Sequence, residues 1–232
     1  MQYTVCLSPS NQDENRYAYG NTNEAAQCQR IANACAAALQ RCGILAITAD
    51  STLGMGEKCK ISDKANADLH IPIHTNAGGG GAGGTRIFCH SLSGQTNGYR
   101  ASQAILKRLA PITPGSTAER VSAYPELYEI QTPKAPTAYV EVDFHDVPAI
   151  AQWIVEHTTE IGEAICNGVC DYFNIPYVTQ KDPEHWSAAA RKWAVDSSLI
   201  VGTSRDTPDY DWKGLVTREQ LVTVLYRFAQ LK

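Results

Sequence analysis

The stretch DLHIPIHTNA, residues 68–77, carries an apolar run into a His-x-Asn element, and a glycine-rich segment at 78–84 follows it. Short apolar runs of this kind are typical of buried strands, and an imidazole where such a strand ends is well placed to bind a ligand. The glycines leave room for that ligand because they carry no side chain. Since many buried histidines only pack, the run predicts a strand and leaves both roles of His74 open.

Strand and helix patterns alternate on both sides of this run. Short β-rich runs lie at 3–7, 44–48, 69–74, 85–89 and 139–144, and helical patterns lie at 24–42, 99–109 and 148–173. The alternation predicts an α/β fold, in which a mostly parallel sheet carries helices on both faces. Ligands gather at the carboxyl ends of such strands, so we expect residues 8–12, 74–76 and 141–146 to converge.

Composition limits the function classes. The chain has 232 residues, 44% of them hydrophobic, and a net charge of −4. This length suits one sizeable domain with a small appendage. The negative charge argues against a nucleic-acid partner, which requires a basic face. The start of the sequence lacks a signal-peptide pattern, and no apolar run reaches membrane-spanning length. We therefore expect cytoplasmic synthesis and no membrane partner.

The eight cysteines look like reduced core residues. Cys28, Cys35 and Cys42 recur every seven residues in a helical segment, which keeps them on one helix face, and Cys166 and Cys170 are one helical turn apart. No C-x-x-C pair occurs, as a typical thiolate metal site would have. The spacing favours packing over metal ligation or disulfides.

Several motifs together resemble a known family. Asn23-Glu24 opens the first helix, IHTNA occupies 73–77, LYEI occupies 127–130, and APTAYVEVDF occupies 135–144. Their order and spacing between residues 3 and 173 resemble the zinc-dependent N-acetylmuramoyl-L-alanine amidases of the AmiC and CwlV type. The resemblance implies hydrolysis of the peptidoglycan amide between N-acetylmuramic acid and L-alanine by zinc-activated water.

The resemblance also implies roles for single residues. Carried over by position, Glu24 and His74 become zinc ligands and Glu141 becomes the general base. A carboxylate and a neutral imidazole suit zinc, and a second carboxylate can take and return the proton of the attacking water. We expect Asn76, and Asn11 and Gln12 in the loop after the first strand, to contact the substrate.

One ligand of the family is missing from this sequence. Where the family has D-P-G-H-G-G, with its first histidine ligand, this chain has SPSNQD at 8–13. Three solutions are open: an amide oxygen of Asn11 or Gln12, a histidine from elsewhere, or no metal at all. Amide oxygens are poorer zinc ligands than imidazole.

His145 is our prediction for the substitute, because it follows Glu141 at the end of the same strand. In a regular strand, Glu141, Asp143 and His145 would lie on one face. The chain would still have to bend after Phe144 for Glu141 and His145 to reach the same ion. We expect Asp143 or Asp146 to fix the tautomer of His145.

The sequence predicts a catalytic domain at 1–175, a polar linker at 176–184, and a helical module at 185–232. The module's W-A, G and T-R-E residues resemble an S-layer homology repeat. That resemblance implies a secondary wall polysaccharide as a partner. The alternative interpretation, which the sequence supports equally, is a helical hairpin that only packs against the rest of the chain or joins copies of it into a homo-oligomer.

These observations together predict an endolysin-like peptidoglycan hydrolase of a phage or prophage, which acts on the cell wall after release from the cytoplasm. Zinc is the expected cofactor and bacterial peptidoglycan the expected partner. The rival prediction, from another class, is a non-catalytic wall-binding protein that has lost the metal site.

Overall fold

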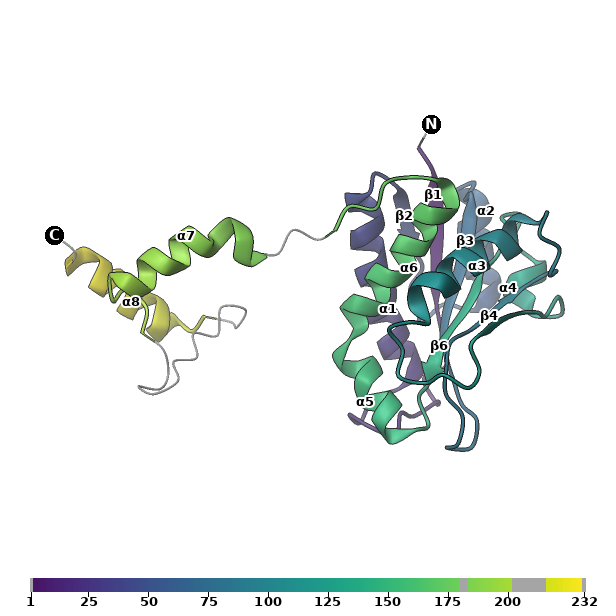
Figure 1. Cartoon of the computed structure of the whole chain (residues 1–232), viewed down its shortest axis with the longest axis horizontal. Helices are drawn as coiled ribbons and strands as arrows, with labels where there is room; N and C mark the ends of the chain where they lie inside the picture. The colour runs from purple at the N-terminus through teal and green to yellow at the C-terminus, as the bar shows by residue number, and fades with distance from the viewer. Residues whose placement is uncertain (1, 180–182, 202–215, 231–232) are drawn as a thin grey trace. The chain divides into compact units, whose positions relative to one another are not determined.

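The computed structural model describes residues 2–179, 183–201 and 216–230 (Figure 1). For residues 183–189 it describes the backbone only. The chain divides into two compact units, Met1–Thr179 and Gln180–Lys232. The division falls inside the segment 176–184, where the sequence predicts a linker. Each unit is described by itself.

The first unit is built on a six-stranded sheet with the order β2-β1-β3-β6-β4-β5. Four strands run parallel to one another, whereas β4 is antiparallel to β6 and β5 is parallel to β4. This mixed but mostly parallel sheet confirms the predicted α/β class. The strands are β1 (Thr4–Pro9), β2 (Leu45–Thr48), β3 (Leu69–Asn76), β4 (Arg86–Cys89), β5 (Arg120–Ala123) and β6 (Tyr139–Phe144).

Helices cover both faces of this sheet, as predicted (Figure 1). α1 and α3 pack against α6 on one face, α2 and α4 contact each other on the other face, and α5 leads from β6 into α6. The helices are α1 (Glu24–Arg41), α2 (Met55–Lys64), α3 (Asn97–Leu109), α4 (Tyr128–Gln131), α5 (Pro148–Glu156) and α6 (Thr158–Phe173).

The two faces of the sheet differ in chemistry. Side chains alternate along a strand, so Ile71 and Ile73 of β3 enter the apolar core under α1 and α6. His70, Pro72 and His74 are on the opposite face, and all three are buried. Polar groups are therefore concentrated on one side of the central strand, where most of the predicted site residues belong.

The structure differs from the sequence-based expectation in three added elements and in the bounds of two predicted ones. The helix α2, the strand β5 and the short helix α4 were not predicted. β1 also continues through Ser8 and Pro9, beyond the run predicted at 3–7, because these residues pair with Pro72 and Ile73 of β3. The pattern at 148–173 forms two helices that meet at His157.

The second unit contains α7 (Pro183–Asp196) and α8 (Arg218–Gln230). Thr217 caps α8: the Gln220 backbone N–H donates to Thr217 Oγ1 at 3.1 Å, and the Thr217 N–H donates to Gln220 Oε1 at 2.7 Å. The central part of the repeat-like pattern, 202–215, lies outside the described residues.

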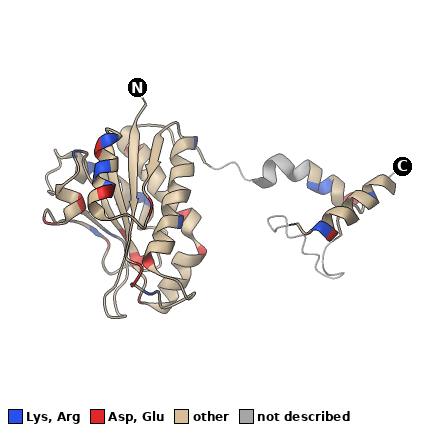
Figure 2. Ribbon diagram, turned by 180° about the vertical axis from the view of Figure 1, so that it is seen from behind, with Lys and Arg blue, Asp and Glu red and all other residues tan. Residues whose placement is uncertain are grey.

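The distribution of charged residues and the hydropathy of the helices can be compared with the expectations from composition. Figure 2 shows Lys and Arg interspersed with Asp and Glu along the helices and loops of the first unit. Among the helices described, none is both long and apolar enough to cross a bilayer. The absence of a nucleic-acid partner stays a prediction.

Candidate active site

The first turn of α1 places Glu24 near the carboxyl end of the central strand β3. The side chain of Asn23 caps this helix, accepting a hydrogen bond from the Ala26 N–H at 2.9 Å. An acidic side chain in the first turn is favoured by the helix dipole. Glu24 is nevertheless only 1% exposed, so its carboxylate is directed into the protein.

The partner of Glu24 is His74, at the carboxyl end of β3. Glu24 Oε1 lies 2.8 Å from His74 Nδ1. Burial would lower the pKa of His74, but the hydrogen bond to Glu24 and the charges of Glu141 and Glu24 outweigh burial and raise it. Burial would raise the pKa of Glu24, yet the hydrogen bond and charge of His74 keep it below its ordinary value. The structure thus joins two of the predicted ligands in a tight, buried pair.

Glu141 lies beside this pair, directly opposite His74 in the register of β3 and β6. Its Oε2 is buried and has no hydrogen-bond partner among the described residues. Burial raises the pKa of Glu141 to about 7, although the charges of His74 and Arg86 act in the other direction. A carboxyl group that titrates near neutrality is suited to take and return a proton.

Two neighbours of the pair escaped the sequence analysis. Asn15 Nδ2 donates to Glu24 Oε2 at 2.8 Å and to Gln12 Oε1 at 2.7 Å, so it links the helix to the loop after β1. The Tyr139 ring stacks on His74 with centroids 4.6 Å apart. Tyr139 could have been found, because it shares strand parity with Glu141, whereas nothing distinguishes Asn15 within its loop.

Arg86 was also missed. It opposes Glu141 in the antiparallel pairing of β4 and β6, and its guanidinium lies 5.0 Å from the centre of the Phe144 ring. Its Nε is buried without a hydrogen-bond partner among the described residues. The positive charge of Arg86 favours the ionised form of Glu141 and so acts to lower the pKa of this carboxyl group.

Of the three predicted substrate contacts, Asn11 and Gln12 lie in the loop after β1 and Asn76 ends β3. Gln12 Nε2 is 3.4 Å from His74 Nδ1. Asn11 is exposed next to it. Asn76 is half-buried at the end of β3, and its Oδ1 accepts the Ala77 N–H at 2.9 Å. These positions stay predictions for substrate binding.

His145 has a different setting from the one that strand parity predicts. β6 ends at Phe144 and the chain turns, so the expected bend is present. The pairing of β3 with β6 also shifts register between His74 and Asn76. His145 Nδ1 lies 2.9 Å from Thr75 Oγ1 and 3.1 Å from the Thr75 carbonyl oxygen. Thr75 follows His74 along β3, so its side chain is on the other face of the strand.

Neither Asp143 nor Asp146, expected to orient His145, hydrogen-bonds it in the structure, and both carboxylates accept backbone N–H groups. Asp143 accepts from Gly84 at 2.7 Å and from Gly115 at 3.0 Å. Asp146 accepts from Gly78 and Gly80, each at 2.9 Å. The two aspartates therefore anchor the glycine-rich loop, and Thr75 and the stacked ring of Tyr17 hold His145.

The pair fits zinc in donor type. Glu24 offers a carboxylate and His74 an imidazole, both common zinc ligands, and Glu141 adds a buried oxygen without a partner. Among the described residues, two groups of at least three His, Cys, Asp or Glu side chains have ligand atoms within 4.8 Å of one another, and neither contains Glu24, His74 or His145. His145 as the third ligand stays a prediction.

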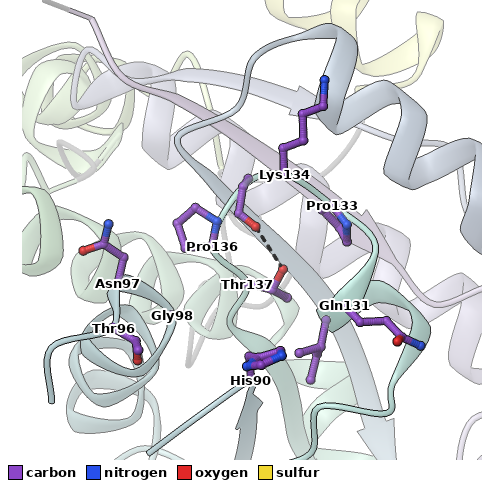
Figure 3. Close-up of a pocket in the computed structure, with 11 residues that line it drawn as sticks. His90, Thr96, Asn97, Gly98, Gln131, Pro133, Lys134, Pro136 and Thr137 are labelled. Atoms are coloured by element: carbon purple, nitrogen blue, oxygen red, sulfur yellow. Dashed lines mark hydrogen bonds between the residues drawn. The ribbon is translucent and has the colours of Figure 1, made fainter. Parts of the chain in front are cut away.

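A cavity of about 370 Å³ lies between the start of α3 and the segment that precedes β6 (Figure 3). Figure 3 shows His90, Asn97, Lys134 and Thr137 around it. None of the predicted site residues lines this cavity. We take the Glu24–His74 pair with Glu141 as the candidate active site, because it is a buried cluster of ionisable groups and Glu141 Oε2 has no hydrogen-bond partner among the described residues.

A family model described as N-acetylmuramoyl-L-alanine amidase matches residues 5–171. The catalytic domain of CwlV, from Bacillus (Paenibacillus) polymyxa var. colistinus, is 16% identical with a TM-score of 0.65, and the match covers 76% of this chain and 100% of that one. AmiC2 of Nostoc punctiforme is 20% identical with a TM-score of 0.63, over 74% of this chain and 97% of its own.

The catalytic domain of the CD27L endolysin, which targets Clostridia difficile, is 18% identical with a TM-score of 0.60, and the match covers 74% of this chain and 97% of that domain. No curated protein matches the chain. At these identities the solved structures show a common fold.

Proposed function

Because this chain belongs to the N-acetylmuramoyl-L-alanine amidase family, we propose that it is an endolysin-like peptidoglycan hydrolase that cleaves the amide bond between N-acetylmuramic acid and L-alanine. One observation carries the proposal: the buried Glu24–His74 pair lies beside a carboxyl group, that of Glu141, whose Oε2 has no partner among the described residues. Such a cluster is costly to bury and is typical of a site that binds or reacts.

Glu24 and His74 would hold a zinc ion. Bound zinc polarises the scissile carbonyl and lowers the pKa of water. Asn15 fixes the carboxylate of Glu24, and Tyr139 supports the ring of His74. For the third ligand we keep His145. Its Nδ1 is engaged by Thr75, which would leave Nε2 for the metal, as ligating histidines are commonly arranged.

Glu141 would act as the general base. It would take a proton from the attacking water and return it to the amine of L-alanine as the bond breaks. The charges of Arg86 and His74 favour its ionised form against burial. The strand-end loops that carry Gln12 and Asn76 are on the same edge of the sheet and would position the sugar and the peptide.

The rival function, non-catalytic wall binding, is favoured by the loss of the family's first histidine from the loop at 8–13. Incubation of the zinc-supplemented protein with soluble muropeptides separates the two functions. An amidase exposes a new L-alanine amino group, detected by amine labelling and mass spectrometry, and His74→Ala should abolish it. Intact substrate, together with retained binding to isolated walls, would overturn the proposal.

The second unit would add wall affinity. Its described part, α7 and α8, agrees with the helical module that the sequence predicts. Binding of secondary wall polysaccharide, or association of two copies, is tested by sedimenting residues 180–232 with walls before and after extraction of that polymer.

A further inference from the structure

Three thiols converge far from the candidate active site. Cys42 caps the end of α1, and Cys166 and Cys170 are one turn apart on α6. Their sulfur atoms all lie within 4.8 Å of one another, and Cys42 Sγ is 3.9 Å from Cys166 Sγ. Glu24 is at the other end of α1, about 27 Å away along an 18-residue helix. The cluster is therefore separate from the Glu24–His74 pair.

The distances suit a thiolate metal site. Zinc binds sulfur at about 2.3 Å with tetrahedral geometry, which places neighbouring sulfurs roughly 3.8 Å apart. The 3.9 Å between the sulfurs of Cys42 and Cys166 is close to this value. The spacing of Cys166 and Cys170 presents both sulfurs on one helix face, toward Cys42.

The surroundings favour the thiolate form of one of the three cysteines, Cys170. Hydrogen bonds from Cys166 and Cys42 outweigh burial and lower the pKa of Cys170 to about 7. Burial raises the pKa of Cys42, and the hydrogen bond to Cys170 together with burial raises that of Cys166, so a bound metal ion would have to displace these two thiol protons. The Val178 backbone N–H donates to Cys42 Sγ at 3.3 Å. A thiolate is the form that binds metal ions.

Close packing of α1 and α6 explains why small residues lie between these helices, but it does not explain why three of them are cysteines in mutual contact. At Gly162 an added Cβ would come within 2.6 Å of the Cys35 nitrogen, so a residue without a side chain is required at this contact of α1 and α6. All eight cysteines are buried and free, as the sequence predicts. Steric need accounts for small residues but not for three sulfur atoms within 4.8 Å of one another.

We infer that Cys42, Cys166 and Cys170 form a structural site for a soft d¹⁰ cation of the zinc type. The carbonyl oxygen of Val178, 3.9 Å from Cys42 Sγ, or a water molecule completes the four ligands. The bound ion joins the end of α1 to α6, and with the Val178 carbonyl as fourth ligand it also fastens the last segment of the first unit. Arg41 Nε already holds this segment at the Val178 carbonyl, at 2.8 Å.

Cobalt(II) titration of the full chain, reduced and freed of metal, tests the inference. Thiolate ligation gives a near-ultraviolet charge-transfer band that carboxylate and imidazole ligands do not give. We expect one equivalent of this band in the wild type and in His74→Ala, which lacks a ligand of the active site. The matched control is Cys89→Ser, because Cys89 is also buried but lies on β4, and it should keep the band. Cys170→Ser should lose it.

A second measurement keeps the test independent of how well Cys170→Ser folds. Zinc should raise the melting temperature of His74→Ala, and the added change Cys42→Ser, at a 9% exposed helix end, should remove that increase. No charge-transfer band in the wild type, a band that persists in Cys170→Ser, or an equal zinc effect with and without Cys42 would overturn the inference.

Discussion

Replacement of Glu141 by glutamine should harm catalysis and help stability at the same time. The amide keeps the shape of the side chain but cannot take a proton from water. Loss of a general base lowers turnover by roughly 10²- to 10⁴-fold, or about 3–5 kcal/mol of barrier. Turnover on soluble muropeptides, with zinc present, measures this loss.

The stability change follows from the pKa of Glu141, which burial raises from 4.5 to about 7. The folded state thus binds this proton more tightly than the unfolded state, so the wild type loses stability as the pH rises through this range. The shift is equivalent to about 3 kcal/mol once the pH exceeds 7. Glutamine carries no charge and avoids this cost. Metal-free Glu141→Gln should therefore be the more stable protein at about pH 8, by up to about 3 kcal/mol.

Urea denaturation in the presence of a chelator, at about pH 8 and again at about pH 5, measures the difference. The gain should shrink at the lower pH, where Glu141 is protonated in the folded state. The control is Glu126→Gln, which alters an exposed carboxylate and should change neither turnover nor stability. Near-normal turnover in Glu141→Gln would remove this residue from the mechanism, and a gain of equal size at both pH values would refute the burial argument.

Three further outcomes are expected. Bound zinc, measured by elemental analysis, should fall by one equivalent in His145→Ala, since the proposed thiolate site stays intact, and should not change in Gln12→Ala; the reverse pattern would assign the third ligand to the amide. A chain ending at Thr179 should fold and cleave soluble muropeptides but sediment less with intact walls, whereas an insoluble product would show that later residues complete the core. Gly162→Ala should destabilise the protein by about 1–3 kcal/mol in urea denaturation, because its Cβ would lie 2.6 Å from the Cys35 nitrogen; unchanged stability would mean that α6 shifts freely.

The parts of the fold that sequence predicted are those with strong local signals. β3 is a short, almost wholly buried stretch that contains Leu69, Ile71 and Ile73, and α1 has a capping Asn23 at one end and Gly43, with a φ of +78°, beyond the other. α2 was missed because it is short and polar, with a start marked only by the Glu57 side chain accepting from the Gly54 N–H. Local signals of that size are easily outweighed by tertiary contacts.

The family resemblance names Glu24 and His74 together, and the topology explains why they meet. Parallel strands and the helices between them bring their functional ends to one edge of the sheet, whatever their distance in sequence. Asn15 could not be found in this way, because its role depends on the positions of two side chains, Gln12 and Glu24, that the fold alone brings together.

The case of His145 shows where strand parity stops being a guide. Parity places every second residue on one face only while the ladder stays regular. Here the register of β3 and β6 slips just beyond Glu141, and the chain turns after Phe144. A residue past such an irregularity takes its direction from its contacts, and His145 is held by Thr75 and Tyr17. A histidine at a strand end is therefore better assigned as a ligand from the contacts of its ring than from strand parity. The nitrogen that does not bind the metal needs a hydrogen-bond partner that fixes the ring, and for His145 Nδ1 this partner is Thr75.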